Sequence, residues 1–111
     1  IKNTPSLIHV NAKIRFKTAE EGGRTGGVMR GYRPNHVFER QDDGTFLMAF
    51  PGDLQFEEPE ILELGKEYEI TVRFLFLFPI EHLIHKGKKW WLNEGSICVG
   101  EGAMLQFEVP E

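Results

Sequence analysis

The sequence of 111 residues contains a single cysteine, Cys98, so an intrachain disulfide is excluded. No apolar run approaches the roughly 20 residues of a membrane-spanning helix, and the longest, 74–80, has the length of a buried strand. No segment of helical length shows a 3.6-residue apolar period. No basic leader with an apolar core opens the chain. We therefore expect a cytoplasmic protein without a membrane partner.

The sequence also lacks the groups that carry most chemistry. It has no G-x-x-x-x-G-K-[ST] phosphate loop, so we expect this chain to bind no nucleotide. No Ser-His-Asp or Cys-His set stands in a context that supports nucleophilic catalysis. His82 and His85, with Glu81 beside them, could donate two metal ligands, but nothing completes the site. The sequence predicts a protein that is not an enzyme and holds no metal or cofactor.

The formal net charge of −4 gives no overall electrostatic case for nucleic acid binding. Basic residues predominate in 9–40 and acidic residues in 53–69. Two interpretations stay open. The charges are either the solvated faces of strands or a bipolar surface that orients a partner.

Two long segments alternate apolar and polar residues with the period of a half-buried strand. One covers 8–16 and the other 68–78. Trp90 and Trp91 are adjacent, so on a strand they point to opposite faces. We expect the following side chains inside: Ile8, Val10, Ala12, Ile14, Phe16, Ile70, Val72, Phe74, Phe76 and Trp90.

Short strands with regular turn signals occupy the rest of the chain, which predicts an all-β fold, a sandwich or barrel, as one domain over 1–111. Asp42-Asp43-Gly44 is a hairpin signal, and Pro51-Gly52-Asp53 is expected to turn the chain again. His9 and His36 are expected on strand surfaces. The other expected elements are strands at 28–30, 36–41, 45–50, 89–93, 96–99 and 103–109, and a basic loop at 79–88.

Two glycine-containing motifs, Glu21-Gly22-Gly23-Arg24 and Gly31-Tyr32-Arg33-Pro34, lie a short segment apart. Glycine and proline are typical of tight turns, with Tyr32 packing on the body of the domain. Alternatively, Arg24 and Arg33 hold a phosphate or carboxylate. Both interpretations can hold at once.

These motifs resemble the C-terminal β-barrel domain (domain 3) of elongation factor Tu, whose pattern has an E-G-G-R loop followed by G-Y-R-P. The resemblance extends from about Val10 to Phe107. Further matches are Pro79-Ile80, where the family has a Pro-Ile pair, and Glu94, Gly95, Val99, Gly100 and Gly102 in its penultimate hairpin. The resemblance implies an antiparallel β-barrel, here without the GTPase domain.

In that family one face of the barrel contacts the GTPase domain and the T-stem of aminoacyl-tRNA. Carried over by position, the residues implied here are Gly22, Gly23, Arg24, Asn35 and Glu94. With Tyr32, Arg33 and Trp91 they form the predicted partner-binding face. Asn35 stands where the family has Gln, Ile97 where it has a second arginine, and Trp91 where it has a small residue.

Three functions follow as alternatives. The net charge and an outward Trp91 favour a non-catalytic module that binds a protein through this face. The resemblance itself implies RNA, aminoacyl-tRNA in particular. A third alternative is a regulatory mimic that competes for a partner of the translation factor. Trp91 could also simply lie over the stems of neighbouring side chains.

Overall fold

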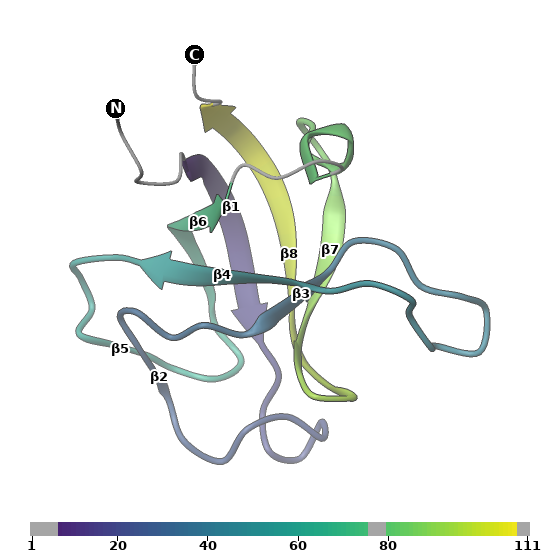
Figure 1. Ribbon diagram of the computed structural model, residues 1–111. Coiled ribbons are helices and arrows are strands. Elements are labelled where there is room, and N and C mark those ends of the chain that lie inside the picture. Colours follow the sequence, from purple (N-terminus) through teal and green to yellow (C-terminus); the bar gives the residue numbers. More distant parts are fainter. Residues whose placement is uncertain (1–6, 76–79, 109–111) are drawn as a thin grey trace.

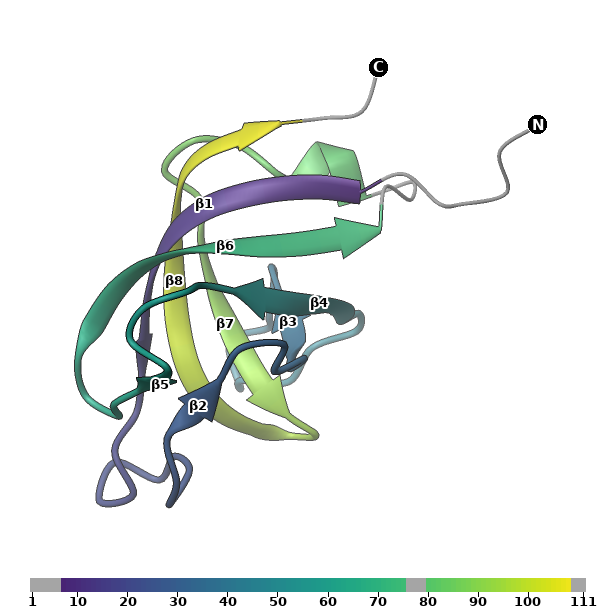
Figure 2. The same cartoon turned by 90° about the vertical axis from the view of Figure 1, so that its left-hand side faces the viewer.

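The computed structural model describes residues 7–75 and 80–108 and is all-β (Figure 1). Six antiparallel strands form a closed barrel in the order β1-β6-β4-β3-β7-β8, with β8 pairing back onto β1. A short two-stranded sheet, β2-β5, lies to one side of it (Figure 2). The predicted all-β antiparallel barrel is confirmed.

The elements follow one another along the chain without an α-helix among the described residues. Their bounds are β1 (Leu7–Phe16), β2 (Val28–Met29), β3 (Asn35–Val37), β4 (Phe50–Gln55), β5 (Ile61–Leu62), β6 (Glu67–Leu75), the 3₁₀ helix η1 (Ile80–Leu83), β7 (Lys89–Glu94) and β8 (Ile97–Glu108). No helix of the described ranges 7–75 and 80–108 is long and apolar enough to cross a membrane.

Strand β1 organises the barrel because it pairs with both β6 and β8 along its length. Its alternation places every second side chain in the core, as expected for a strand with one buried face. All predicted inward-facing residues that the structure describes are 4% exposed or less. They are Ile8, Val10, Ala12, Ile14, Phe16, Ile70, Val72, Phe74 and Trp90; Phe76 lies outside the described residues.

Two glycines make room for the largest core rings. Gly52 pairs with Phe74 across β4 and β6, and a Cβ at Gly52 would stand 2.8 Å from that ring. Gly102 pairs with Trp90 across β7 and β8, and a Cβ there would stand 2.7 Å from the indole. Contacts this short would force the rings to move, so the barrel needs glycine at these positions for space.

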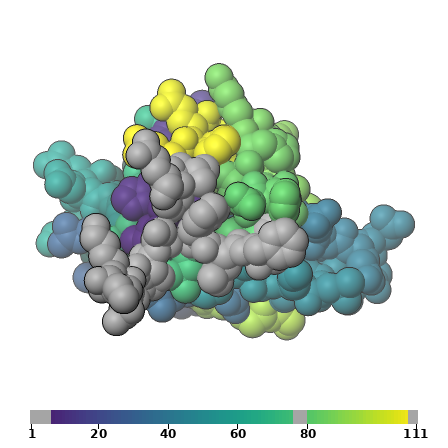
Figure 3. Space-filling view, turned by 45° about the horizontal axis from the view of Figure 1, so that its top comes forward, coloured from purple at the N-terminus to yellow at the C-terminus, as the bar shows by residue number. Residues whose placement is uncertain are grey.

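The segment between 36 and 55 corrects several predictions. Pro51-Gly52-Asp53 is not a turn but part of β4, which pairs with β3 on one side and β6 on the other. The strand predicted at 36–41 is the shorter β3, which ends at Val37. Of the strand predicted at 45–50, residues 45–49 are not in a strand. The turn at Asp42-Asp43-Gly44 is present, with the Gln41 N–H donating to the Thr45 carbonyl at 2.7 Å. Residues 38–49 thus leave the barrel as a projecting loop (Figures 1 and 3).

The C-terminal half differs in one further way. The two strands predicted at 96–99 and 103–109 are a single strand, β8. Gly100 and Gly102 lie within it rather than between two strands. The predicted basic loop contains η1 in its described part.

His36 is fully buried, whereas the sequence placed it on a strand surface. Its Nε2 donates to the Gly52 carbonyl oxygen at 2.9 Å, which leaves Nδ1 to accept from the Trp90 indole N–H at 2.9 Å. This arrangement requires the neutral ring with the proton on Nε2. Burial lowers the pKa of His36 to about 4, against the opposing effects of the Gly52 carbonyl and Asp53. The core therefore contains a satisfied, uncharged polar pair.

Candidate functional site

The Glu21-Gly22-Gly23-Arg24 loop is built around one carboxylate. Glu21 Oε1 accepts from the Thr18 backbone N–H at 2.9 Å and from Arg15 Nη2 at 2.9 Å. These bonds, that of the Thr18 N–H foremost, lower the pKa of Glu21 to about 2. Gly22 has φ +91°, a conformation that L side chains rarely adopt. The loop is therefore a tight turn, as the sequence predicts.

Gly23 is needed in this turn for space. A Cβ at Gly23 would lie 2.4 Å from the Lys17 carbonyl oxygen, an atom of the backbone that cannot yield easily. We expect Gly23→Ala to lower the free energy of unfolding by about 1–3 kcal/mol, the usual cost of overpacking. Gly26→Ala is the matched control, because a Cβ at Gly26 meets nothing within 4 Å. Urea denaturation of both variants tests this, and equal losses would contradict it.

Arg24, Tyr32 and Glu94 meet at one end of the barrel. Glu94 Oε2 accepts from Arg24 Nη1, in an ion pair, and from the Tyr32 hydroxyl. The Arg24 guanidinium also lies over the Tyr32 ring, 4.7 Å from its centroid. Tyr32 in turn packs edge-on against the core residue Phe16, with 5.8 Å between centroids. The cluster ties the glycine-rich loop, the turn before β3 and the end of β7 together.

The charges of this cluster are matched internally. The Tyr32 hydroxyl, and then Arg24, hold the pKa of Glu94 below its usual range against the effect of burial. Burial and the neighbouring carboxylate raise the pKa of Tyr32. Arg24 therefore presents a guanidinium that is already paired, and the cluster stabilises the fold of the face more directly than it offers a free cation.

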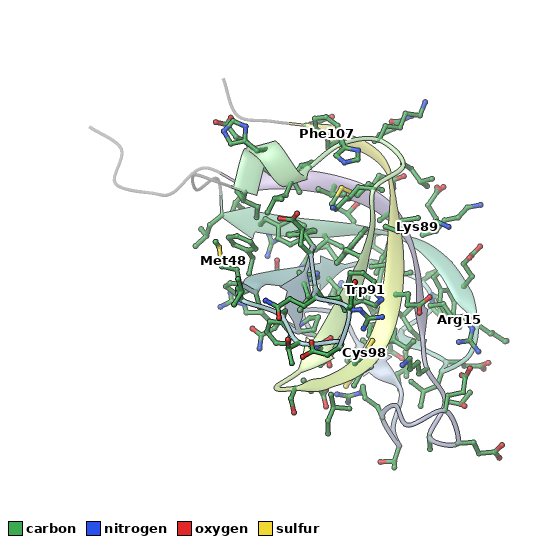
Figure 4. All side chains as sticks on the ribbon, turned by 90° about the vertical axis from the view of Figure 1, so that its right-hand side faces the viewer. Arg15, Met48, Lys89, Trp91, Cys98 and Phe107 are labelled. Carbon is green, nitrogen blue, oxygen red and sulfur yellow. The ribbon has the colours of Figure 1, made fainter. Side chains whose placement is uncertain are left out.

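Trp91 lies on the outer side of β7, where its partners in register are Val37 of β3 and Glu101 of β8. It is half-buried, and the Arg40 guanidinium covers it at 3.9 Å from the ring centroid. Figure 4 views this side of the molecule, toward which the 38–49 loop projects. A cation over an indole is a favourable contact that also keeps the guanidinium edge available to acceptors.

An apolar groove lies beside Arg40, between the projecting loop and η1. Its volume is about 420 Å³. Leu47 and Met48 stand on one wall and are 88% and 50% exposed. The remaining lining residues are Phe38, Glu39, Arg40, Gln41, Phe50, His82 and Leu83.

The predicted partner-binding residues divide into two groups. Arg24, Tyr32 and Glu94 contact one another, with Gly22 and Gly23 shaping the adjoining loop. Asn35 is exposed and pairs with Asn93, the residue before Glu94. Trp91 lies on the same strand, three residues before Glu94. We call this surface, with Arg40 and the groove, the β7 face. Arg33 does not join it; it lines a separate cleft with Asp53 and Arg73.

Sequence reasoning did not single out Arg40, Leu47 or Met48. The apolar run at 46–48 directly follows the hairpin turn. Because the sequence predicts this run to be the return strand of the hairpin, its side chains are not expected to be exposed. His82 and His85 belong to no cluster of three or more potential metal ligands within 7–75 and 80–108.

No protein-family model matches this sequence. The structure defines a small all-β protein with a closed six-strand antiparallel barrel. This architecture is compatible with a barrel like domain 3 of elongation factor Tu.

Proposed function

We propose that this protein is a non-catalytic binding module, similar to domain 3 of elongation factor Tu, that engages a protein partner through the β7 face. The observation that carries the proposal is the Arg40–Trp91 stack beside an apolar groove. Tryptophan and arginine dominate the hot spots of protein interfaces, where they lie next to apolar pockets.

The chemistry of the β7 face specifies the kind of partner segment. The groove accepts an apolar side chain, and the exposed Leu47 and Met48 gain burial when it does so. Arg40, whose guanidinium lies over the Trp91 ring, can donate hydrogen bonds to a carboxylate. The partner therefore presents an apolar residue close to an acidic one.

Two local features and the net charge of the chain disfavour RNA as the partner. Arg24 is paired with Glu94 and is not free for a phosphate. Ile97 is 57% exposed at the position where the resemblance implies an arginine. The net charge of −4 adds a general repulsion of polyanions.

We expect Trp91→Ala to weaken partner binding by about 2 kcal/mol or more, roughly thirtyfold, with little loss of stability. A benzophenone amino acid at Leu47 captures the partner, whose affinity for the wild-type protein and for Trp91→Ala is then titrated. Met29→Ala is the matched control, because Met29 is an equally apolar residue, 63% exposed, on β2. An unchanged affinity of Trp91→Ala would refute the protein-binding interpretation of this face.

Filter binding of bulk tRNA across a salt series separates the RNA alternative. Binding to phosphates falls steeply with added salt because counterions are released. We expect weak or no retention of tRNA. Tight, salt-sensitive binding that Arg24→Ala reduces more than Trp91→Ala would replace the protein partner with RNA.

A further inference from the structure

A second cleft, separate from the β7 face, lies where β4 meets the ends of β1 and β6. It has a volume of about 200 Å³. Two arginines and one aspartate line it, together with the apolar residues Leu7, Pro51 and Leu75. Gly52 also lines the cleft. The combination of guanidinium groups and an apolar wall is that of a site for a small organic anion.

Arg73 is held in a fixed orientation in this cleft. Its Nε donates to Asp53 Oδ1 at 3.0 Å and its Nη2 to Asp53 Oδ2 at 2.5 Å. Gln55 Nε2 donates to the same carboxylate at 3.0 Å. The hydrogen bonds from Arg73 hold the pKa of Asp53 below its usual range, so the carboxylate stays ionised. The pair uses Nε and Nη2, which leaves Nη1 available to a further acceptor.

Arg33 supplies a second guanidinium to the cleft. It is exposed, and no described residue in 7–75 or 80–108 accepts a hydrogen bond from it or pairs with its charge. The buried Pro34 follows it and restricts its backbone to an extended conformation, which limits where the side chain can go. Arg33 therefore brings to the cleft a solvent-exposed guanidinium that no described residue pairs with, beside Arg73, whose guanidinium Asp53 already orients.

We propose that this cleft binds the carboxyl-terminal residue of a peptide that ends in an apolar side chain. The two arginines and Asp53 sum to a single positive charge, which matches one carboxylate. Leu7, Pro51 and Leu75 bury the apolar side chain. The volume is below the roughly 300–1,000 Å³ of sites for drug-sized ligands, so the cleft admits one residue.

The same charges disfavour phosphate. Asp53 lies on the cleft wall and is ionised, so it opposes the second charge of a phosphate dianion. A carboxylate has no second charge to be opposed, and its two oxygens match the fork of a guanidinium. This proposal is independent of the protein-binding function of the β7 face.

The test is an NMR titration of isotope-labelled protein with acetyl-Gly-Gly-Leu, as the free acid and as the carboxyl-terminal amide. We expect the acid to shift the amide signals of residues lining the cleft with a millimolar or lower Kd, and the amide to bind at least tenfold more weakly. Arg33→Ala should weaken binding of the acid at least tenfold. Arg30→Ala is the matched control, because Arg30 is also exposed and lies outside the cleft.

Three results would overturn the proposal. One is no perturbation of the cleft by 10 mM acid peptide, roughly tenfold above a millimolar Kd. Another is equal binding of acid and amide. The third is tighter binding of inorganic phosphate than of the acid peptide at the same residues, which would make the cleft a phosphate site.

Discussion

Phe74→Ala should lower the free energy of unfolding by about 3–5 kcal/mol, the usual cost of removing a fully buried phenyl group. Phe74 is 0% exposed and packs against His36 and Phe38, with ring centroids 4.7 and 5.6 Å away. Its ring also covers Gly52 on the neighbouring strand, and this glycine has no side chain that could move into the space that alanine leaves. Urea denaturation followed by tryptophan fluorescence measures the loss.

Leu75→Ala is the control for this prediction, because Leu75 is the next residue of β6 and faces outward at 36% exposed. We expect its cost to stay below about 1 kcal/mol, as for most partly exposed substitutions. Equal losses of stability in both variants would contradict the assignment of Phe74 to the inward face of β6 and of Leu75 to its outward face.

Lowering the pH from 7 to 5 should reduce the free energy of unfolding by about 2 kcal/mol through His36 alone. The folded protein holds the pKa of His36 at about 4, below the ordinary value of 6.5, because the ring is buried. Between pH 4 and pH 6.5 the His36 ring therefore binds more protons in the unfolded chain than in the folded one. The stability that this pKa shift contributes is present above pH 6.5 and is lost as the pH falls toward 4.

The range between pH 7 and 5 isolates this histidine from the carboxylates. Glu21 has its pKa lowered from 4.5 to about 2, so the stability that it contributes is lost below about pH 4.5. Urea denaturation at several pH values between 7 and 5 gives the slope. His36→Gln can still accept from Trp90 and donate to Gly52 but does not titrate, so its slope should be much smaller. His9→Gln, at an exposed position of β1, is the control that should keep the wild-type slope.

Alternation was sufficient to predict which side chains of β1 and β6 enter the core. A strand with one buried face must alternate, so the pattern around Val10 and Val72 needs no knowledge of its neighbours. The same local rules predicted the turns at Gly22 and Gly44, both with positive φ. They failed at Pro51-Gly52-Asp53, which forms β4 because β3 and β6 pair with it from both sides.

The candidate site divides in the same way. The motifs around Arg24, Tyr32 and Glu94 were visible in the sequence, and the resemblance placed them near one face. Their convergence on a single carboxylate oxygen joins positions 62 and 70 residues apart, and the non-local pairing of β3 with β7 brings Glu94 to the segment before β3. The stacking of Arg40 on Trp91 depends likewise on the pairing of β3 with β7.

Periodicity in the chain determined which face of each strand is apolar, because burial of one face imposes a two-residue repeat on local sequence. It could not determine that His36 is buried, since a histidine enters a core only when distant groups such as the Trp90 indole and the Gly52 carbonyl satisfy both ring nitrogens. Nor could periodicity predict that Arg24 pairs with Glu94 while Arg33 lines a different cleft. The direction of each arginine depends on which strand end lies beside it, and that is set by non-local strand pairing, which the tertiary structure alone decides.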